Sequence, residues 1–289
     1  NVVTATTVTR ANAEGFGFGT ITFTADMLGA SQRSKTFEYE VAETCGSIPG
    51  IDYASNKAVI KVTVTDDGTG KLKASAAIED GVFVNRYEAS LSYSAAGGLS
   101  VAKTLTGRDM AEGQFVISVT PADETSAQAL GLPLAGKEVA MPAAADGVQV
   151  AKSVVDGAVT FTQKDAGKTY TYTVAELGES GNGYTYDKTV RTVTITVADN
   201  PAAAALTVTT VVTGGPEGTQ EFTYTDAGAA GGKRAVVSFA NSYAASTDVP
   251  GGAAASVNAT KALTGRPLGA GEFAFAVEYA IGGGDVLQA

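Results

Sequence analysis

The sequence predicts an all-β protein built of tandem immunoglobulin-like antiparallel β-sandwich domains. Two observations support this prediction. Short alternating runs rich in β-branched residues recur along the chain, separated by turns such as Asp66–Gly68 and Gly181–Gly183. The segment Ala102–Val119 (AKTLTGRDMAEGQFVISV) also reappears, as Thr260–Val277 (TKALTGRPLGAGEFAFAV), 158 residues further on. A repeat of this length indicates tandem domains rather than one large fold.

Seven segments have the period-two pattern of a strand, in which alternate side chains share a face. They are Gly19–Thr24, Thr36–Val41, Ala58–Thr65, Ala158–Thr162, Thr169–Val174, Val190–Val197 and Leu206–Val212. Asp123–Leu132 is the best candidate for a helix, and it is short. Helices are therefore expected to contribute little to the core.

Two small-residue, unpatterned stretches, Ser92–Gly98 and Ala244–Ala255, are the expected joints between domains. Residues 1–92 are then a β-sandwich without its first strands, and residues 97–246 are a complete one. Residues 254–289 are the first strands of a further repeat, which we expect to complete residues 1–92 of a neighbouring copy.

The amino-acid composition excludes several classes of catalytic and binding site. The 289 residues include no His and no Trp, which excludes a Ser-His-Asp or Cys-His nucleophile and removes the commonest nitrogen ligand of zinc. A net charge of −10 argues against nucleic-acid binding. No apolar run is long enough for membrane insertion in this segment. We expect no cofactor and no metal, and the lone Cys45 is expected to be a semi-buried thiol.

Each of three short motifs occurs twice along the chain. K-x-L-T-G-R begins at Lys103 and at Lys261, and Y-x-V-x-E ends at Glu176 and at Glu43. F-x-N-x-Y is centred on Asn241 and on Asn85. The middle copy therefore holds a lysine, a glutamate and an asparagine, whereas the first copy holds Glu43 and Asn85 and the last copy begins with Lys261.

Strand parity places these polar residues in phase with apolar ones. Glu176 alternates with Tyr172 and Val174, and Lys103 lies in phase with Val101 and Leu105. Asn241, Glu43 and Asn85 likewise lie in phase with apolar residues of their own segments. One amine, one carboxyl and one carboxamide per domain should therefore face the core.

Burial favours the neutral forms of an amine and an acid, because it lowers a lysine pKa and raises a glutamate pKa. A neutral amine is a nucleophile, and a carboxamide becomes an electrophile when an acid polarises it and protonates the departing ammonia. The combination predicts a Lys–Asn isopeptide bond.

Together the motifs resemble the isopeptide-forming β-sandwich domains of Gram-positive pilins and adhesins, the collagen-adhesin B-type and pilin isopeptide-linkage family. The resemblance implies a Lys103–Asn241 cross-link catalysed by Glu176, and a Lys261–Asn85 cross-link catalysed by Glu43. It also implies a structural stalk on the cell surface, anchored to the cell wall through regions outside this segment. Such a single-turnover intramolecular reaction does not make the protein an enzyme.

The Lys261–Asn85 pairing can arise in two ways. Lys103 precedes Glu176 by 73 residues, and in a copy placed directly after Ala289 the next Glu43 would follow Lys261 by 71 residues. The chain is then either one period of a longer tandem array, which we favour, or a separate molecule that donates strands to the next one. In both cases the partners are neighbouring identical copies, arranged head to tail.

An alternative function is a ligand-binding adhesin module that recognises a host protein or glycan through exposed loops. Its best candidate is the loop Asp123–Asp146, which is rich in small residues and contains no aromatic side chain. In the stalk interpretation, a host-surface ligand would instead be bound by other domains of the protein.

Overall fold

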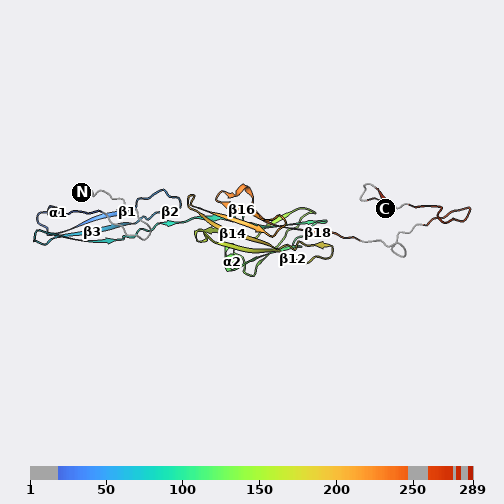
Figure 1. Cartoon of the computed structure of the whole chain (residues 1–289), viewed down its shortest axis with the longest axis horizontal. Helices are drawn as coiled ribbons and strands as arrows, with labels where there is room; N and C mark the ends of the chain where they lie inside the picture. Colours follow the sequence, from blue (N-terminus) through green and yellow to red (C-terminus); the bar gives the residue numbers. More distant parts are fainter. Residues whose placement is uncertain (1–18, 247–259, 276–277, 281–285, 289) are drawn as a thin grey trace. The chain divides into compact units, whose positions relative to one another are not determined.

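The computed structural model describes residues 19–246, 260–275, 278–280 and 286–288. The chain divides into two compact units, residues 1–243 and 244–289 (Figure 1). Within the described residues, none of the helices combines the length and apolar character needed to cross a bilayer. The fold is all-β, as the sequence predicts.

Residues 89–243 form the larger β-sandwich. Its strands are β6 (Ser90–Ser92), β7 (Leu99–Thr106), β8 (Val116–Pro121), β9 (Lys137–Ala140), β10 (Val150–Ser153), β11 (Thr160–Thr162), β12 (Thr169–Leu177), β13 (Tyr184–Thr185), β14 (Arg191–Asn200), β15 (Ala205–Thr213), β16 (Gln220–Thr225), β17 (Gly228–Ala229) and β18 (Ala235–Tyr243). The helical segments are α2 (Glu124–Leu130), η1 (Gln163–Asp165) and η2 (Ala230–Gly232).

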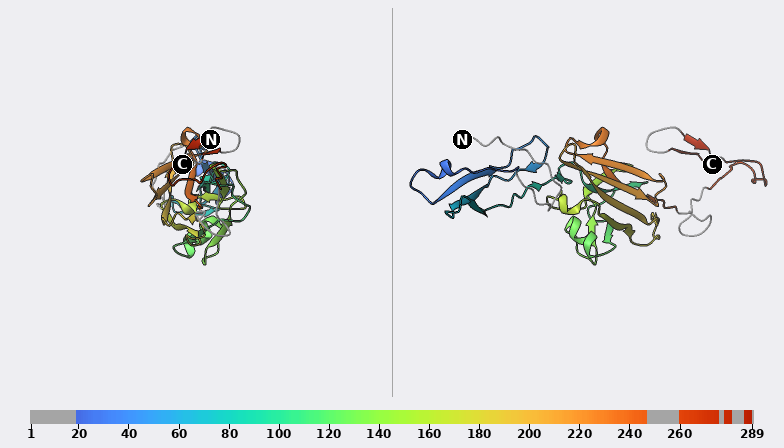
Figure 2. Two further views of the ribbon diagram at one scale, coloured as in Figure 1. Left: turned by 90° about the vertical axis from the view of Figure 1, so that its right-hand side faces the viewer. Right: turned by 60° about the vertical axis from the view of Figure 1, so that its left-hand side comes forward.

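Two sheets enclose the core of this sandwich (Figure 2). One has seven strands in the order β17-β16-β15-β14-β12-β8-β9, and the other has four in the order β10-β7-β18-β13. The short pair β11-β6 adds Leu91 and Phe161 to the same core. The predicted strands Thr169–Val174, Val190–Val197 and Leu206–Val212 are confirmed as β12, β14 and β15. Only Thr160–Thr162 of Ala158–Thr162 is strand.

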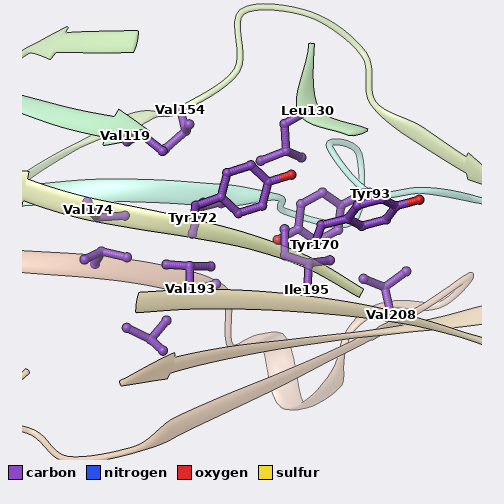
Figure 3. Close-up of a cluster of buried hydrophobic side chains, with 14 of the residues drawn as sticks. Tyr93, Val119, Leu130, Val154, Tyr170, Tyr172, Val174, Val193, Ile195 and Val208 are labelled. Carbon is purple, nitrogen blue, oxygen red and sulfur yellow. The ribbon is translucent and has the colours of Figure 1, made fainter. Parts of the chain in front are cut away.

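The alternating sequence produces the sandwich because every second side chain of each inner strand is buried. In β12, Tyr170, Tyr172 and Val174 are buried, while the threonines between them are more exposed. Figure 3 shows these three side chains packing with Val193 and Ile195 of β14. Burying a side chain of this size contributes about 1.5–3 kcal/mol, so the strand phase is strongly determined.

The pairing of β7 with β18 differs from the purely antiparallel arrangement that the sequence predicts. These strands run parallel, with Lys103 opposite Phe239 and Leu105 opposite Asn241. Parallel neighbours need a long crossover connection, and here the rest of the sandwich supplies it. The first and last long strands of the domain therefore lie side by side in one sheet.

The predicted helix over Asp123–Leu132 is present as the shorter α2. The side chain of Asp123 caps it by accepting a hydrogen bond from Ser126 N at 2.7 Å. Gly131, in the left-handed conformation at φ 63°, ends it.

Residues 19–88 form a smaller sheet. The elements are α1 (Ala25–Leu28), β1 (Ser34–Ala42), β2 (Ile51–Asp52), β3 (Lys57–Asp66), β4 (Leu72–Glu79) and β5 (Arg86–Tyr87). The main sheet has the order β1-β3-β4 and covers a small cluster of Leu28, Val62 and Val64. The predicted strands Thr36–Val41 and Ala58–Thr65 are confirmed as β1 and β3.

Two expectations for this region are wrong. Gly19–Thr24 has the alternation of a strand but pairs with no strand among the described residues; Phe23 packs on Phe37 with ring centroids 5.0 Å apart. Alternation alone does not make a strand, because the backbone also needs a ladder partner. Cys45 is exposed rather than semi-buried, because it lies in a loop outside the strands.

In the second unit, β19 (Glu278–Ala280) pairs with β20 (Val286–Gln288). Residues 260–275, which carry the second K-x-L-T-G-R motif, have no strand. The prediction that residues 254–289 are the first strands of a further repeat falls partly outside the described residues. The division into domains 1–92, 97–246 and 254–289 stays a prediction, and the chain already contributes to the larger core at Ala89.

Candidate functional site

The site lies between the two sheets of the larger sandwich. Lys103 and Asn241 come from the neighbouring parallel strands β7 and β18, and Glu176 comes from β12 in the facing sheet. All three are buried, with 0% of Lys103, 8% of Glu176 and 3% of Asn241 exposed. Strand parity predicts this placement, and the structure brings all three groups together.

The Glu176 carboxylate is the centre of the site. Lys103 Nζ lies 3.1 Å from Glu176 Oε1 and donates a hydrogen bond to Oε2 at 3.3 Å. Asn241 Nδ2 donates to the same Oε1 at 2.9 Å. The amine and the carboxamide therefore converge on one oxygen atom, which places the two potential reactants beside each other.

Burial drives both charged groups toward their neutral forms. Desolvation lowers the pKa of Lys103, although the Glu176 charge opposes this shift. Desolvation raises the pKa of Glu176, against the influence of Lys103 and Asn241. Transfer of one proton from the ammonium to the carboxylate leaves a neutral amine next to a neutral acid without changing the number of bound protons.

The oxygen atom of the Asn241 carboxamide also has a hydrogen-bond partner. The backbone N–H of Asp187 donates a hydrogen bond to Asn241 Oδ1 at 2.7 Å. The carboxamide oxygen thus already has a donor of the kind that stabilises developing negative charge during acyl transfer.

Asp187 is itself fixed by a buried ion pair. Arg191 Nη2 lies 2.8 Å from Asp187 Oδ2, and Arg191 is 1% exposed. Burial alone would raise the pKa of Asp187, but the hydrogen bonds from Arg191 and Thr189 and the Arg191 charge hold it at about 2. The Arg191 guanidinium also lies 4.0 Å from the ring centroid of Phe239.

An aromatic ring completes the surroundings of the amine. Lys103 Nζ lies 4.9 Å from the ring centroid of Phe115, which is fully buried. Phe115 packs in turn against Tyr184 and Tyr186. The amine therefore lies against buried apolar surface as well as against Glu176, and this burial is the desolvation that lowers the pKa of Lys103.

The second set of predicted residues is only partly assembled. Asn85 Nδ2 donates to Glu43 Oε1 at 2.7 Å, as Asn241 does to Glu176. Glu43 is half-buried and Asn85 is exposed, so the expectation that both face a core is wrong here. Among the described residues, the core beside the sheet β1-β3-β4 is the small cluster around Leu28, Val62 and Val64, which includes neither Glu43 nor Asn85. Lys261 lies in the other unit and is exposed.

Sequence reasoning missed three groups of the site. Arg191 could have been found, because it is in phase with Val193 and Ile195 in a predicted strand. Phe115 could have been found from its repetition as Phe273. Asp187 carries no sequence signal, because its contribution is a backbone N–H in a loop.

The comparisons with known proteins point to one family. No curated protein matches the chain. The model of the family of Spy0128-like isopeptide-containing domains (FctA) matches residues 1–88 and again residues 99–244. The two matched stretches contain the Glu43–Asn85 pair and the Lys103, Glu176 and Asn241 site. The chain therefore belongs to the family of Spy0128-like isopeptide-containing domains, as a pilin-like structural protein.

Proposed function

We propose that Lys103 and Asn241 become joined by an isopeptide bond with Glu176 as the acid–base group, in a shaft module of a Gram-positive surface pilus or adhesin. The observation that supports this most directly is the convergence of a buried amine and a buried carboxamide on one carboxyl oxygen. A structural ion pair would not need the asparagine there.

The reaction balances within the site. The neutral Lys103 Nζ attacks Asn241 Cγ, and the Asp187 N–H stabilises the charge that develops on Oδ1. Glu176 takes the surplus proton from the attacking nitrogen and delivers a proton to Asn241 Nδ2. The Cγ–Nδ2 bond breaks, ammonia leaves, and a secondary amide remains. Fixed placement of the reactants can contribute about 7–11 kcal/mol in well-oriented systems.

The position of the bond fits a load-bearing role. It would join the first and last long strands of the sandwich, which run parallel side by side. Tension applied at the two ends of the domain would pass through the covalent bond and leave the intervening strands unloaded. The bond-forming reaction occurs once in each molecule, so the protein is structural rather than enzymatic.

The alternative, a ligand-binding module, has a candidate surface in the predicted loop. An open hollow is lined by residues around the end of α2 and by Val155–Thr160. Its two charged groups, Lys137 and Asp156, already pair with each other at 2.8 Å. The hollow therefore offers no unpaired charged group for recognition, and we favour the shaft.

Intact-mass measurement tests the proposal. The Asn85→Ala chain, which keeps Lys103, Glu176 and Asn241 as its single complete set of reacting groups, should weigh one ammonia less than its sequence requires, and adding Glu176→Gln should restore the full mass. Glu179→Gln is the matched control, because the Glu179 side chain is 92% exposed three residues away and pairs with Lys188. A folded wild-type protein of unreduced mass would refute the cross-link.

A further inference from the structure

The Glu43–Asn85 pair reproduces one half of the larger site. Asn85 Nδ2 donates to Glu43 Oε1 at 2.7 Å, and Asn85 Oδ1 accepts a hydrogen bond from Ala54 N at 2.8 Å. Both ends of this carboxamide are thus held, as in Asn241. Glu43 Oε2 is a buried atom with no hydrogen-bond partner among the described residues. The corresponding Glu176 Oε2 accepts a hydrogen bond from Lys103.

None of the lysines of residues 1–88 is available to Glu43. Lys57 pairs with Glu40, Lys61 pairs with Glu79, Lys73 lies near Asp67, and Lys35 donates to the Met27 carbonyl. Lys71 lies in the turn after β3, and the β1–β3 register places that turn at the end of the sheet opposite to Glu43. Lys57 is the nearest in register, opposite Ala42, but strand parity puts it on the other face from Glu43.

Residues 260–275 reproduce the other half. Lys261 opens the second K-x-L-T-G-R motif, and its Nζ lies 4.6 Å from the ring centroid of Phe273. Lys103 and Phe115 have the same twelve-residue spacing and a separation of 4.9 Å. The second motif thus holds its amine against an aromatic ring in the same way, but Lys261 is exposed.

The strand arrangement shows how the two halves would fit. In the larger sandwich β12 lies between β14 and β8, whereas the corresponding β1 has β3 on one side and no strand on the other among the described residues. Ile117 of β8 lies opposite Glu176, and Phe275 is its counterpart in the second motif. Phe275 would therefore lie opposite Glu43, the residue that directly follows β1, along the free edge of that strand.

Exposed apolar side chains occur on both surfaces. Phe275 is 67% exposed, and Val82 and Val84, beside Asn85, are 75% and 63% exposed. An open strand edge next to apolar surface is a site for pairing with another chain. Docking would cover these side chains and enclose Glu43, Asn85 and the incoming amine.

We propose that the Glu43–Asn85 pair accepts Lys261 of a second copy of this chain and forms an isopeptide bond between the copies. The inference rests on the proposed function, because it requires the same chemistry. Lys261 Nζ attacks Asn85 Cγ and the Cγ–Nδ2 bond breaks. Glu43 moves one proton from the attacking nitrogen to the leaving one, and ammonia departs. Copies linked in this way form a head-to-tail covalent fibre.

Two variants of the full chain separate the role of lysine donor from the role of asparagine acceptor. Asn85→Ala keeps the donor lysine and removes the acceptor, and its use as a donor does not require residues 19–88 to fold. Lys261→Arg keeps the acceptor and changes only an exposed side chain; its guanidinium stays protonated and cannot attack. Each variant alone should stay monomeric under denaturing electrophoresis, whereas their mixture should give a covalent heterodimer.

Mass spectrometry gives the decisive readout. The heterodimer should weigh one ammonia less than its two monomers together, and a peptide containing Lys261 should be joined to one containing Asn85. Adding Glu43→Gln to the acceptor should slow dimer formation by about a hundredfold or more. Glu40→Gln, on the other face of β1, should not slow it.

The outcomes distinguish this inference from the proposed function. Monomers that each lack one ammonia, with no heterodimer, would leave the Lys103–Asn241 bond standing and overturn the link between copies. Wild-type monomers lacking two ammonias would also overturn it, because both bonds would then lie within one chain. Monomers of unreduced mass would overturn both proposals.

Discussion

Asp187 holds Asn241 through its backbone, with its N–H donating to the carboxamide oxygen Oδ1 at 2.7 Å. The Asp187 side chain is meanwhile paired with the buried Arg191 at 2.8 Å. Arg191 donates its hydrogen bonds to Asp187 and Thr189 rather than to the three proposed reacting groups, and it thereby fixes the loop that presents the donor. The ion pair is therefore a positioning device for the proposed reaction.

Weakening this pair should slow cross-linking. Asp187→Asn keeps the backbone N–H but loses the charge that anchors the loop, so we expect the bond to form about tenfold more slowly. Complete loss of such a donor costs about 10²–10³ in rate. The protein is refolded from denaturant after expression in an unfolded form, and the loss of ammonia is followed with time by mass spectrometry. Asp226→Asn, in an exposed turn, is the control and should react at the wild-type rate.

The same pair should matter for stability. In a Lys103→Met background, which prevents cross-linking, Asp187→Ala leaves the Arg191 charge buried without a partner. We expect a loss of about 3–5 kcal/mol in the free energy of unfolding, measured with urea. Adding Arg191→Met should recover a large part of that loss. Equal stability of the single and double variants would contradict the buried-charge explanation.

Lowering the pH should remove the stabilisation of the folded state that the ionised Asp187 carboxylate provides. Its pKa is about 2 in the folded protein and about 3.9 for an unperturbed aspartate. Because the folded pKa is the lower one, the stabilisation is complete above pH 4 and is lost as the pH falls toward 2. The Lys103→Met protein should lose about 2 kcal/mol from this group over that interval. Other carboxyls titrate there too, so the measurement is the difference in slope between this protein and its Asp187→Asn derivative, which should be shallower.

The cross-link itself should stabilise the folded domain. Lys103→Met removes the amine at similar size, and we expect the midpoint of thermal unfolding to fall. The lost stabilisation should be about 4–5 kcal/mol if chain-entropy estimates for long disulfide loops apply. Calorimetry measures it, with Lys152→Met on the neighbouring strand β10 as the control, since Lys152 only contacts a surface carbonyl. An unchanged midpoint would indicate that the bond is absent or carries no stability.

Mechanical extension of single molecules tests independently whether the Lys103–Asn241 bond carries load. With handles at the two ends of the full chain, the wild-type protein should show no extension from residues 104–240, because the bond bypasses them. Lys103→Met should add an unfolding step of roughly 450 Å, from about 3.3–3.6 Å per residue. The Glu179→Gln protein should behave as wild type. A step of this length in the wild-type protein would exclude a load-bearing bond.

The strands and their phase could be predicted from the sequence because burial imposes a period of two on each inner strand. Tyr172, Val174 and Glu176 alternate with threonine and alanine, and that pattern alone places the carboxyl on the buried face. The repeated motifs likewise identified Lys103 and Asn241. These inferences succeeded because they depend on local order along one strand.

The remaining features depend on contacts between residues far apart in the sequence. Parallel pairing of β7 with β18, which puts Lys103 next to Asn241, is a property of sheet topology that leaves no local pattern. The Asp187 N–H could not be foreseen, because every residue except proline carries that donor and only the loop path selects one. The exposure of Asn85 was missed for a related reason: parity assigns a face, but whether that face is covered depends on a second sheet. The sequence by itself thus determined which groups could react, and the tertiary structure decided which of them meet.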